Sequence, residues 1–186
     1  QLHLQALEGA LRRRMTEEEY AAVDPSLQAA YTILSQEMAP ETPFVSAEAP
    51  QGDLASRYLE LLRHNAEDEA VQTIAGAVDE GLSVHAAYLH VIQPVQQEIG
   101  RLWQINEISV AEEHAATEVS RRLMTELRSR FTPHRRRGRR ILTACLGGEL
   151  HDMGARMVND FFCLAGFDSY FTGANTPHRV VNAELN

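Results

Sequence analysis

The stretch Gly147-Gly148-Glu149-Leu150-His151-Asp152-Met153-Gly154 decides how the C-terminal part of this chain folds. It follows an apolar run at 141–146, which is typical of a buried strand, and precedes a helical pattern over 154–165. Open α/β sheets bind ligands in the loops at the carboxyl ends of their strands. The flanking glycines also let a ligand approach the backbone closely. The sequence therefore places His151 in a candidate ligand-binding loop.

The same alternation continues to the end of the sequence. Gly166 ends the helix, 168–172 has the pattern of a second strand, and Thr176-Pro177 opens another helix. Parallel strands need a crossover helix, as this order provides. Because two strands do not make a stable doubly wound sheet, the α/β domain over 140–186 is expected to be incomplete in this chain.

A helical region precedes the α/β part. Four amphipathic segments with short connections predict a four-helix bundle over 53–130. A possible kink is expected at Pro94 in the third segment, and Ser109 with Glu112 forms a capping box for the fourth. The segments are expected to begin at Asp53, Glu67, Ser83 and Ser109.

Two further segments flank the bundle. Residues 1–38 have a weakly amphipathic helical pattern, and 39–52 carry three prolines among small polar residues, which predicts a linker. The N-terminal helical extension is therefore expected to be an appendage available for docking. A basic linker is expected at 131–139, and the basic run 134–140 is either a solvated linker or a contact to phosphate or a partner.

Composition excludes several classes of protein. The 186 residues have a net charge of −9, which argues against a protein whose main task is to grip nucleic acid. No run of 18 apolar residues and no secretory signal pattern occur, so no membrane association is expected. Cys145 and Cys163 have no disulfide or metal-ligand spacing and are expected to be small core residues. A reducing cytoplasm is the predicted location.

His151 has two possible roles in its loop. Glu149 and Asp152 supply carboxylates that can hold one ring nitrogen, the arrangement that fixes the tautomer of a metal-ligating histidine. Alternatively, His151 is an ordinary hydrogen-bonding loop residue and Asp152 caps the following helix. The loop sequence by itself leaves both readings open.

A second set of candidate residues lies in the bundle. Trp103, the only tryptophan, ends the third helix, and Glu113 and His114 stand on the first turns of the fourth. Helical spacing places Val110, His114, Thr117 and Arg121 on one face of that helix, and favours Ala111, Ala115, Val119 and Leu123 for packing. The alternative is a core tryptophan beside an exposed Glu–His pair.

Together the two sets resemble one family. The loop Glu149-x-His151-x-x-Gly154 resembles the Asp-x-His-x-x-Gly signature of cobalamin-binding domains related to methionine synthase. Trp103, nine residues, then Glu113-His114 resembles the helical cap of the light-sensing cobalamin regulators typified by CarH and LitR. The resemblance spans about residues 53–186 and implies a helix-bundle cap followed by a Rossmann-like (flavodoxin-like) cobalamin-binding domain.

The resemblance also implies roles for single residues. His151 would be the lower axial ligand of the cobalt, Glu149 or Asp152 would orient it, and Gly154 would admit the nucleotide tail. Four residues would cover the upper face of the corrin: Trp103, Val110, Glu113 and His114. The implied cofactor is cobalamin, with adenosyl, methyl or hydroxyl left open as the upper ligand.

This sequence departs from the family pattern at two positions. Glu149 stands where the wider family usually has Asp, and Gln104 stands where light-sensing relatives often have a histidine. Residues 1–52 do not resemble the winged helix that reads DNA in such regulators.

A cap of this kind without a DNA-binding domain resembles the AerR/PpaA antirepressors. It implies a light or redox sensor, not an enzyme, that regulates transcription through a repressor similar to CrtJ/PpsR. DNA contact would occur only within a ternary complex. Two alternatives remain: a corrinoid carrier protein for methyl transfer, and a helical regulatory domain without a cofactor.

Overall fold

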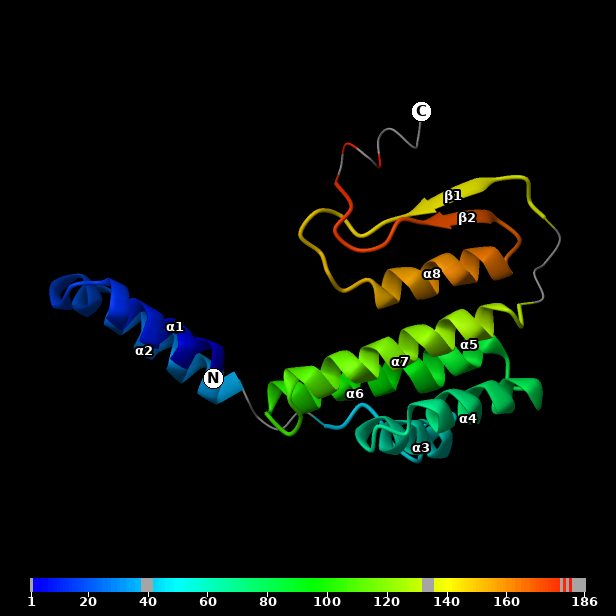
Figure 1. Cartoon of the computed structure of the whole chain (residues 1–186), viewed down its shortest axis with the longest axis horizontal. Coiled ribbons are helices and arrows are strands. Elements are labelled where there is room, and N and C mark those ends of the chain that lie inside the picture. Colours follow the sequence, from blue (N-terminus) through cyan, green and yellow to red (C-terminus); the bar gives the residue numbers. More distant parts are fainter. Residues whose placement is uncertain (1, 38–41, 132–135, 178, 180, 182–186) are drawn as a thin grey trace. The chain divides into compact units, whose positions relative to one another are not determined.

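The computed structural model describes residues 2–37, 42–131, 136–177, 179 and 181, and the chain divides into two compact units at Thr42 (Figure 1). The first unit is a helical hairpin of α1 (Leu2–Arg14) and α2 (Glu17–Glu37), as the helical pattern predicts. Glu8 of α1 accepts hydrogen bonds from the hydroxyl of Tyr31 at 3.0 Å and of Tyr20 at 3.2 Å. These bonds across the hairpin hold its two helices together.

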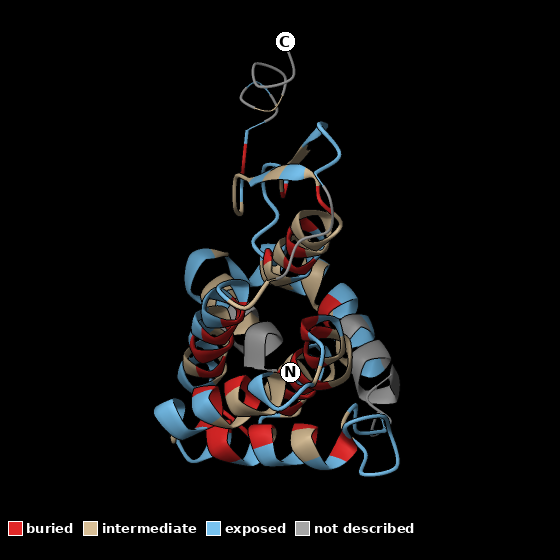
Figure 2. Ribbon diagram, turned by 90° about the vertical axis from the view of Figure 1, so that its right-hand side faces the viewer, coloured by how far each residue is buried: buried red, intermediate tan, exposed pale blue. Residues whose placement is uncertain are grey.

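The second unit contains the helical core. Its helices are α3 (Gly52–Arg63), α4 (Glu67–Asp79), α5 (Val84–Ala87), the π-helical segment η1 (Tyr88–Ile92), α6 (Gln93–Gln104) and α7 (Val110–Arg128). The segments α5, η1 and α6 are continuous in sequence, and α3, α4 and α7 pack with them around one apolar core. Figure 2 shows the buried faces of these helices turned toward one another. Fully buried side chains of this core include Tyr58, Ile74, Tyr88, Ile92 and Leu123.

Two of the predicted helix N-caps are confirmed by the structure. Ser83 accepts a hydrogen bond from the backbone of Ala86, and Ser109 and Glu112 form the predicted capping box. The first helix begins at Gly52, one residue before the expected Asp53. A Cβ on Gly52 would lie 2.1 Å from the carbonyl oxygen of Ser46, so only glycine fits where the chain enters α3.

The bend expected at Pro94 takes the form of a π-helical turn. Proline has no amide hydrogen, and its ring collides with the carbonyl four residues earlier. Pro94 stands in the first turn of α6, directly after η1, and the wider π turn accommodates its ring. The third helix of the bundle is therefore continuous through the proline.

The predicted linker at 39–52 is divided between two environments. Residues 38–41 lie outside the described residues, but from Pro43 onward the segment belongs to the second unit. The backbone amide of Phe44 donates to Glu98 of α6 at 2.9 Å, and Val45 packs against the helical core. The predicted linker from Pro43 onward is thus part of the bundle unit and is attached to it at Phe44 and Val45.

The α/β part has the predicted β–α–β order. Strand β1 (Arg140–Thr143) and strand β2 (Asp168–Phe171) are parallel, with Arg140 opposite Asp168, and α8 (Met153–Leu164) connects them. Beyond the strands, Leu146 and Thr176 form one further parallel bridge. Both strands are shorter than predicted. The helix expected after Thr176 and the start of the basic run fall largely outside the described residues.

Helix α8 forms a middle layer between the sheet and the bundle (Figure 1). Its buried Asp160 accepts a hydrogen bond from Tyr88 at 2.9 Å and pairs with Arg128 at 2.7 Å. Burial raises the pKa of Asp160, and these two partners offset that effect only in part. Phe161 adds ring contacts to His85 and Tyr88 at 4.9 and 5.7 Å. The βαβ unit is therefore packed onto the bundle through α8.

Two predictions from composition can be compared with the structure. Both cysteines are free, with Cys145 buried and Cys163 partly buried. Within the described ranges, no helix is long and apolar enough to span a membrane.

Candidate cofactor site

The structure pairs His151 with Glu149. The Nδ1 atom of His151 lies 2.7 Å from Oε1 of Glu149, and the same oxygen accepts the backbone amide of His151 at 2.6 Å. These two hydrogen bonds lower the pKa of Glu149. The His151 side chain is 97% exposed, and no described residue bonds to Nε2. A carboxylate thus holds one ring nitrogen while the other is available to a ligand.

The backbone around His151 is fixed by the loop that follows β2. The amide of Gly148, whose φ is +94°, donates to the side chain of Asn175 at 2.8 Å, and the amide of Asn175 donates to the carbonyl of Glu149 at 2.9 Å. The two loops at the carboxyl ends of β1 and β2 therefore support each other. His151 stands at the edge of the sheet where parallel α/β folds bind ligands.

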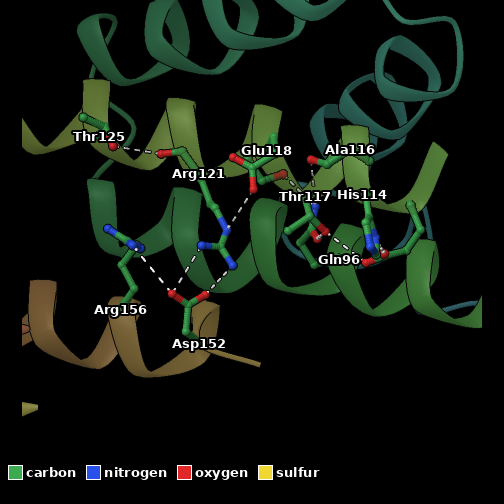
Figure 3. A network of polar contacts seen from close by, with 11 residues as sticks. Gln96, His114, Ala116, Thr117, Glu118, Arg121, Thr125, Asp152 and Arg156 are labelled. Atoms are coloured by element: carbon green, nitrogen blue, oxygen red, sulfur yellow. Dashed lines mark hydrogen bonds and ion pairs between the residues drawn. The ribbon is translucent and has the colours of Figure 1, made fainter. Parts of the chain in front are cut away.

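Asp152 has a different role from either of those expected. Its side chain does not cap α8, and it pairs with Arg121 of α7 at 2.5 Å and with Arg156 at 3.7 Å (Figure 3). The carboxylate is 4% exposed. Of the two acids proposed to orient His151, only Glu149 contacts the ring. Asp152 instead connects the loop to the bundle, because a buried carboxylate needs a cationic partner.

Gly154 lies in the first turn of α8, directly beyond the loop. No heavy atom of the described chain stands within 4 Å of the position that a Cβ would take there. Packing within the chain therefore does not require glycine at this position. Its predicted contact with the nucleotide tail stays a prediction.

The bundle residues of the predicted upper face lie at the junction of α6 and α7. Trp103 is partly buried and packs against the helical core, whereas Val110 is 53% exposed. His114 is exposed on the next turn, and its Nδ1 lies 2.5 Å from Oε2 of Glu113. The side chain of Trp103 therefore packs partly against the core and is partly exposed. The Glu113–His114 pair lies at the surface.

The packing face of α7 differs from the predicted one. Ala111 is exposed, so its predicted packing role is wrong, and Ala115 is partly buried. Val119 and Leu123 are buried as predicted. Small alanine side chains do not indicate which face of a helix is buried. The buried side of α7 consists of Ala116, Val119, Ser120, Leu123, Met124 and Leu127.

A chain of hydrogen bonds that the sequence did not predict connects Glu113 to the core. Thr117 donates to Glu113 at 3.1 Å or to Gln96 of α6 at 3.2 Å. Gln96 donates to Ser120 at 2.6 Å, and Ser120 bonds to the buried hydroxyl of Tyr58 at 2.9 Å. Figure 3 shows Thr117 and Gln96 of this network beside the Arg121–Asp152 pair. The spacing of Glu113 and Thr117, four residues apart on one helix, was the available signal.

The His151–Glu149 pair suits a metal that is bound as part of a cofactor. Among the described residues, no group of three or more His, Cys, Asp or Glu side chains could hold a bare metal ion. An imidazole whose other nitrogen is held by a carboxylate is instead suited to serve as an axial ligand of a metal within a cofactor. Exposed apolar side chains, Leu146 and Leu150 in the loop and Val110 on α7, are available to a large ring. The residues present thus fit a planar cofactor with axial ligands.

Comparisons with known proteins agree with this interpretation. Residues 54–128 match the family model described as B12 binding domain. The structure is similar to the monomethylamine corrinoid protein of Methanosarcina barkeri, with a TM-score of 0.63 and 14% identity over 72% of this chain. The chain spans 63% of that protein, so it corresponds to part of it. A search of curated protein sequences found no match.

Two further solved structures are more distant. One is the methanol:cobalamin methyltransferase complex MtaBC of Methanosarcina barkeri, with a TM-score of 0.44 and 16% identity over 96% of this chain and 64% of that one. The other is a cobalamin-binding protein from Desulfitobacterium hafniense, with a TM-score of 0.38 and 17% identity over 72% of this chain and 62% of that one. At these TM-scores neither carries a structural argument.

The findings support cobalamin as the cofactor of this protein. They also show a helical protein with a small parallel sheet whose fold is similar to that of a corrinoid protein. The names of these three solved proteins do not refer to light sensing, an antirepressor or transcription regulation.

Proposed function

We propose that this protein binds cobalamin with His151 as the lower axial ligand and serves as a corrinoid carrier in methyl transfer. One observation carries the binding proposal. Glu149 holds Nδ1 of His151 at 2.7 Å, and Nε2 is exposed at the carboxyl edge of the sheet. In this arrangement a carboxylate that accepts the hydrogen bond from one ring nitrogen fixes the tautomer of a metal-ligating imidazole and raises its basicity.

Each residue of the site then has a defined task. Nε2 of His151 would hold the cobalt, and Glu149, which contacts Nδ1, would keep the proton on that nitrogen. Asp152 holds the loop against α7 through Arg121. Four residues of α6 and α7 would cover the upper face of the cofactor: Trp103, Val110, Glu113 and His114. Bound cobalamin supplies a cobalt centre that accepts and releases a methyl group.

The carrier role is supported by the similarity of the fold to the monomethylamine corrinoid protein. A carrier performs no turnover alone, because partner methyltransferases deliver and remove the methyl group. Its upper face must therefore be accessible to a partner protein. The exposed Val110 and His114 at the start of α7 agree with such access.

A second candidate is a light or redox sensor that acts on a transcriptional repressor. The Glu113–His114 pair favours it, because the hydroxyl of Thr117 can donate either to Glu113 or to Gln96. Gln96 in turn donates to Ser120, which is bonded to buried Tyr58. A change of upper ligand at that position would be transmitted to the helical core. If the protein is such a sensor, two parts of the chain would contact the repressor: the unit of α1 and α2, and the basic run 134–140.

The binding proposal is tested with His151→Ala and the control His64→Ala, which removes an exposed histidine from the end of α3. After incubation with cobalamin in darkness and gel filtration, the control should retain the corrinoid with the absorption spectrum of the unsubstituted protein. His151→Ala should lose the imidazole-ligated spectrum and retain less corrinoid. An unchanged spectrum in His151→Ala would show that His151 is not the lower ligand of the cobalt.

The two functions are then separated with the loaded, unsubstituted protein. Transfer of a methyl group from the loaded protein to a corrinoid-dependent methyltransferase supports the carrier. A spectral change on blue-green illumination, with altered binding of a repressor, supports the sensor. Absence of bound corrinoid in the unsubstituted protein would contradict both.

A further inference from the structure

Asn175, in the loop that follows β2, contacts the His151 loop at two backbone atoms. Its side-chain oxygen accepts a hydrogen bond from the amide of Gly148 at 2.8 Å, and its own amide donates to the carbonyl of Glu149 at 2.9 Å. The two loops meet because β1 and β2 are parallel and end at the same edge of the sheet (Figure 1). Asn175 therefore fixes the backbone of Glu149, the residue whose carboxylate contacts His151.

The attachment of one loop to the other does not depend on Asn175. The amide of Thr176 donates to the carbonyl of Cys145 at 2.8 Å, and Leu146 and Thr176 form a parallel bridge. Thr176 is 6% exposed, so this connection lies in the interior. The bonds from Asn175 extend the support to residues 148–149, which the bridge does not reach. Their effect is thus confined to the part of the loop that carries the Glu149 carboxylate.

The backbone of Asn175 is suited to this contact. Its φ is +52°, in the left-handed region that asparagine and aspartate enter more readily than most other residues. Gly148, whose amide it accepts, has a φ of +94°, which favours glycine. The contact therefore combines a glycine on one loop with a short polar side chain on the other.

We propose that Asn175 is a positioning residue that acts through Glu149 and keeps the imidazole of His151 in its ligating orientation. The inference rests on the proposed function, because it concerns the same site. One oxygen of Glu149 accepts the backbone amide of His151 and lies 2.7 Å from its Nδ1. The ring is 97% exposed, and no other side chain in the described part of the chain bonds to it. If the backbone of Glu149 moves, the ring is free to rotate and to take the other tautomer.

Two substitutions separate the side chain of Asn175 from its backbone. Asn175→Gly allows the same φ and removes the acceptor oxygen, whereas Asn175→Asp keeps an acceptor and tolerates the same φ. The matched control is Asn65→Gly, because Asn65 has a φ of +54° in the turn between α3 and α4, outside the site. Asn175 is exposed, so its variants are expected to fold, which circular dichroism checks.

The first measurement needs no cofactor. Each protein is labelled with ¹⁵N-histidine, and NMR at alkaline pH reports which nitrogen of His151 carries the proton, with His151→Ala to identify its signals. One tautomer, protonated at Nδ1, is expected in the unsubstituted protein, in Asn65→Gly and in Asn175→Asp. Asn175→Gly should show a mixture of both tautomers, because the carboxylate no longer holds the ring.

The second measurement adds hydroxocobalamin in darkness and records the absorption spectrum. Asn175→Gly should bind the corrinoid about tenfold more weakly than the unsubstituted protein, with a smaller share of the imidazole-ligated spectrum. Asn175→Asp should restore both the affinity and the spectrum, and Asn65→Gly should change neither.

The outcomes distinguish this inference from the proposed function. If Asn175→Gly keeps a single tautomer and full affinity, the positioning role is refuted, while loss of the imidazole-ligated spectrum in His151→Ala still supports the lower ligand. If Asn175→Asp behaves like Asn175→Gly, the acceptor oxygen is not the cause and the inference also fails. If no corrinoid binds to the unsubstituted protein, the proposed function fails. A tautomer change confined to Asn175→Gly would then still support the positioning role.

Discussion

Replacement of Arg121 by methionine is expected to loosen the His151 loop from the bundle. The guanidinium of Arg121 lies 2.5 Å from Asp152, whose side chain is 4% exposed. Methionine keeps much of the aliphatic length of arginine and removes the charge. Asp152 would then remain buried with Arg156, 3.7 Å away, as its cationic partner.

The size of the effect follows from this geometry. Removal of one partner from a fully buried ion pair costs about 3–5 kcal/mol. Arg121 is 31% exposed and a second arginine stays near the carboxylate, so the expected loss is roughly half of that, about 1.5–2.5 kcal/mol. Cobalamin affinity should fall by roughly tenfold, which corresponds to about 1.4 kcal/mol.

Urea unfolding followed by the fluorescence of Trp103 measures this loss in the second unit, because Trp103 is the only tryptophan. The matched control is Arg122→Met, one position further along α7. Arg122 pairs with Asp68 at 2.8 Å, but the two side chains are 45% and 85% exposed, so a loss of about 0–1 kcal/mol is expected. A double-mutant cycle with Asp152→Asn should give a coupling of about 1–2 kcal/mol.

Equal losses of stability in Arg121→Met and Arg122→Met would refute the special role of the Arg121–Asp152 pair. A coupling near zero in the cycle would do the same, because it would show that the two side chains act independently. Unchanged cobalamin affinity, with the expected loss of stability, would show that the pair supports the fold alone.

Two further predictions concern carboxylates whose pKa is lowered in the folded protein. Glu149→Gln removes the charge from the partner of His151 and should weaken cobalamin binding by about 10–100-fold. A titration followed by absorption measures this affinity, and equal affinities would contradict the proposal that Glu149 orients His151. Burial pushes the pKa of Glu98 upward, but hydrogen bonds from Arg101 and the amide of Phe44 outweigh it, so the pKa is lowered overall. Glu98 therefore stabilises the fold above its unfolded pKa of about 4.3, and this contribution is lost as the pH falls through the lower folded value. The stability difference between the unsubstituted protein and Glu98→Gln should accordingly shrink between about pH 5 and pH 3 in urea unfolding, and a difference that does not vary with pH would exclude this origin.

Local signals predicted the elements of the fold well. The helix predicted to begin at Glu67 is α4, and the capping box of Ser109 gives the start of α7. Such signals depend on neighbours in the sequence, which is why they can be read without a structure. The attachment of residues 43–45 to α6 depends on Glu98, a contact between residues 54 positions apart, and a proline-rich composition contains no sign of it.

The candidate site was predicted in part for the same reason. The Glu149–His151 pair lies within three residues, so the sequence already offered Glu149 as one of two possible partners. It could not decide against Asp152, because that choice depends on Arg121, which is 31 positions away along the chain. Likewise the support of Glu113 by Gln96 and Ser120 requires α6 and α7 to be side by side.

Helix α7 connects the two faces of the proposed site. Its C-terminal half contacts α8 and the His151 loop through Arg128 and Arg121, and its first turns carry Glu113 and His114. One unbroken helix from Val110 to Arg128 therefore sets the spacing between the His151 loop and the residues predicted to cover the upper face. A partner that gains access to the upper face must then displace side chains at the start of α7 rather than open a hinge within this helix. Any signal from the upper face would leave through the network of Thr117, Gln96 and Ser120, which couples that turn to the bundle core.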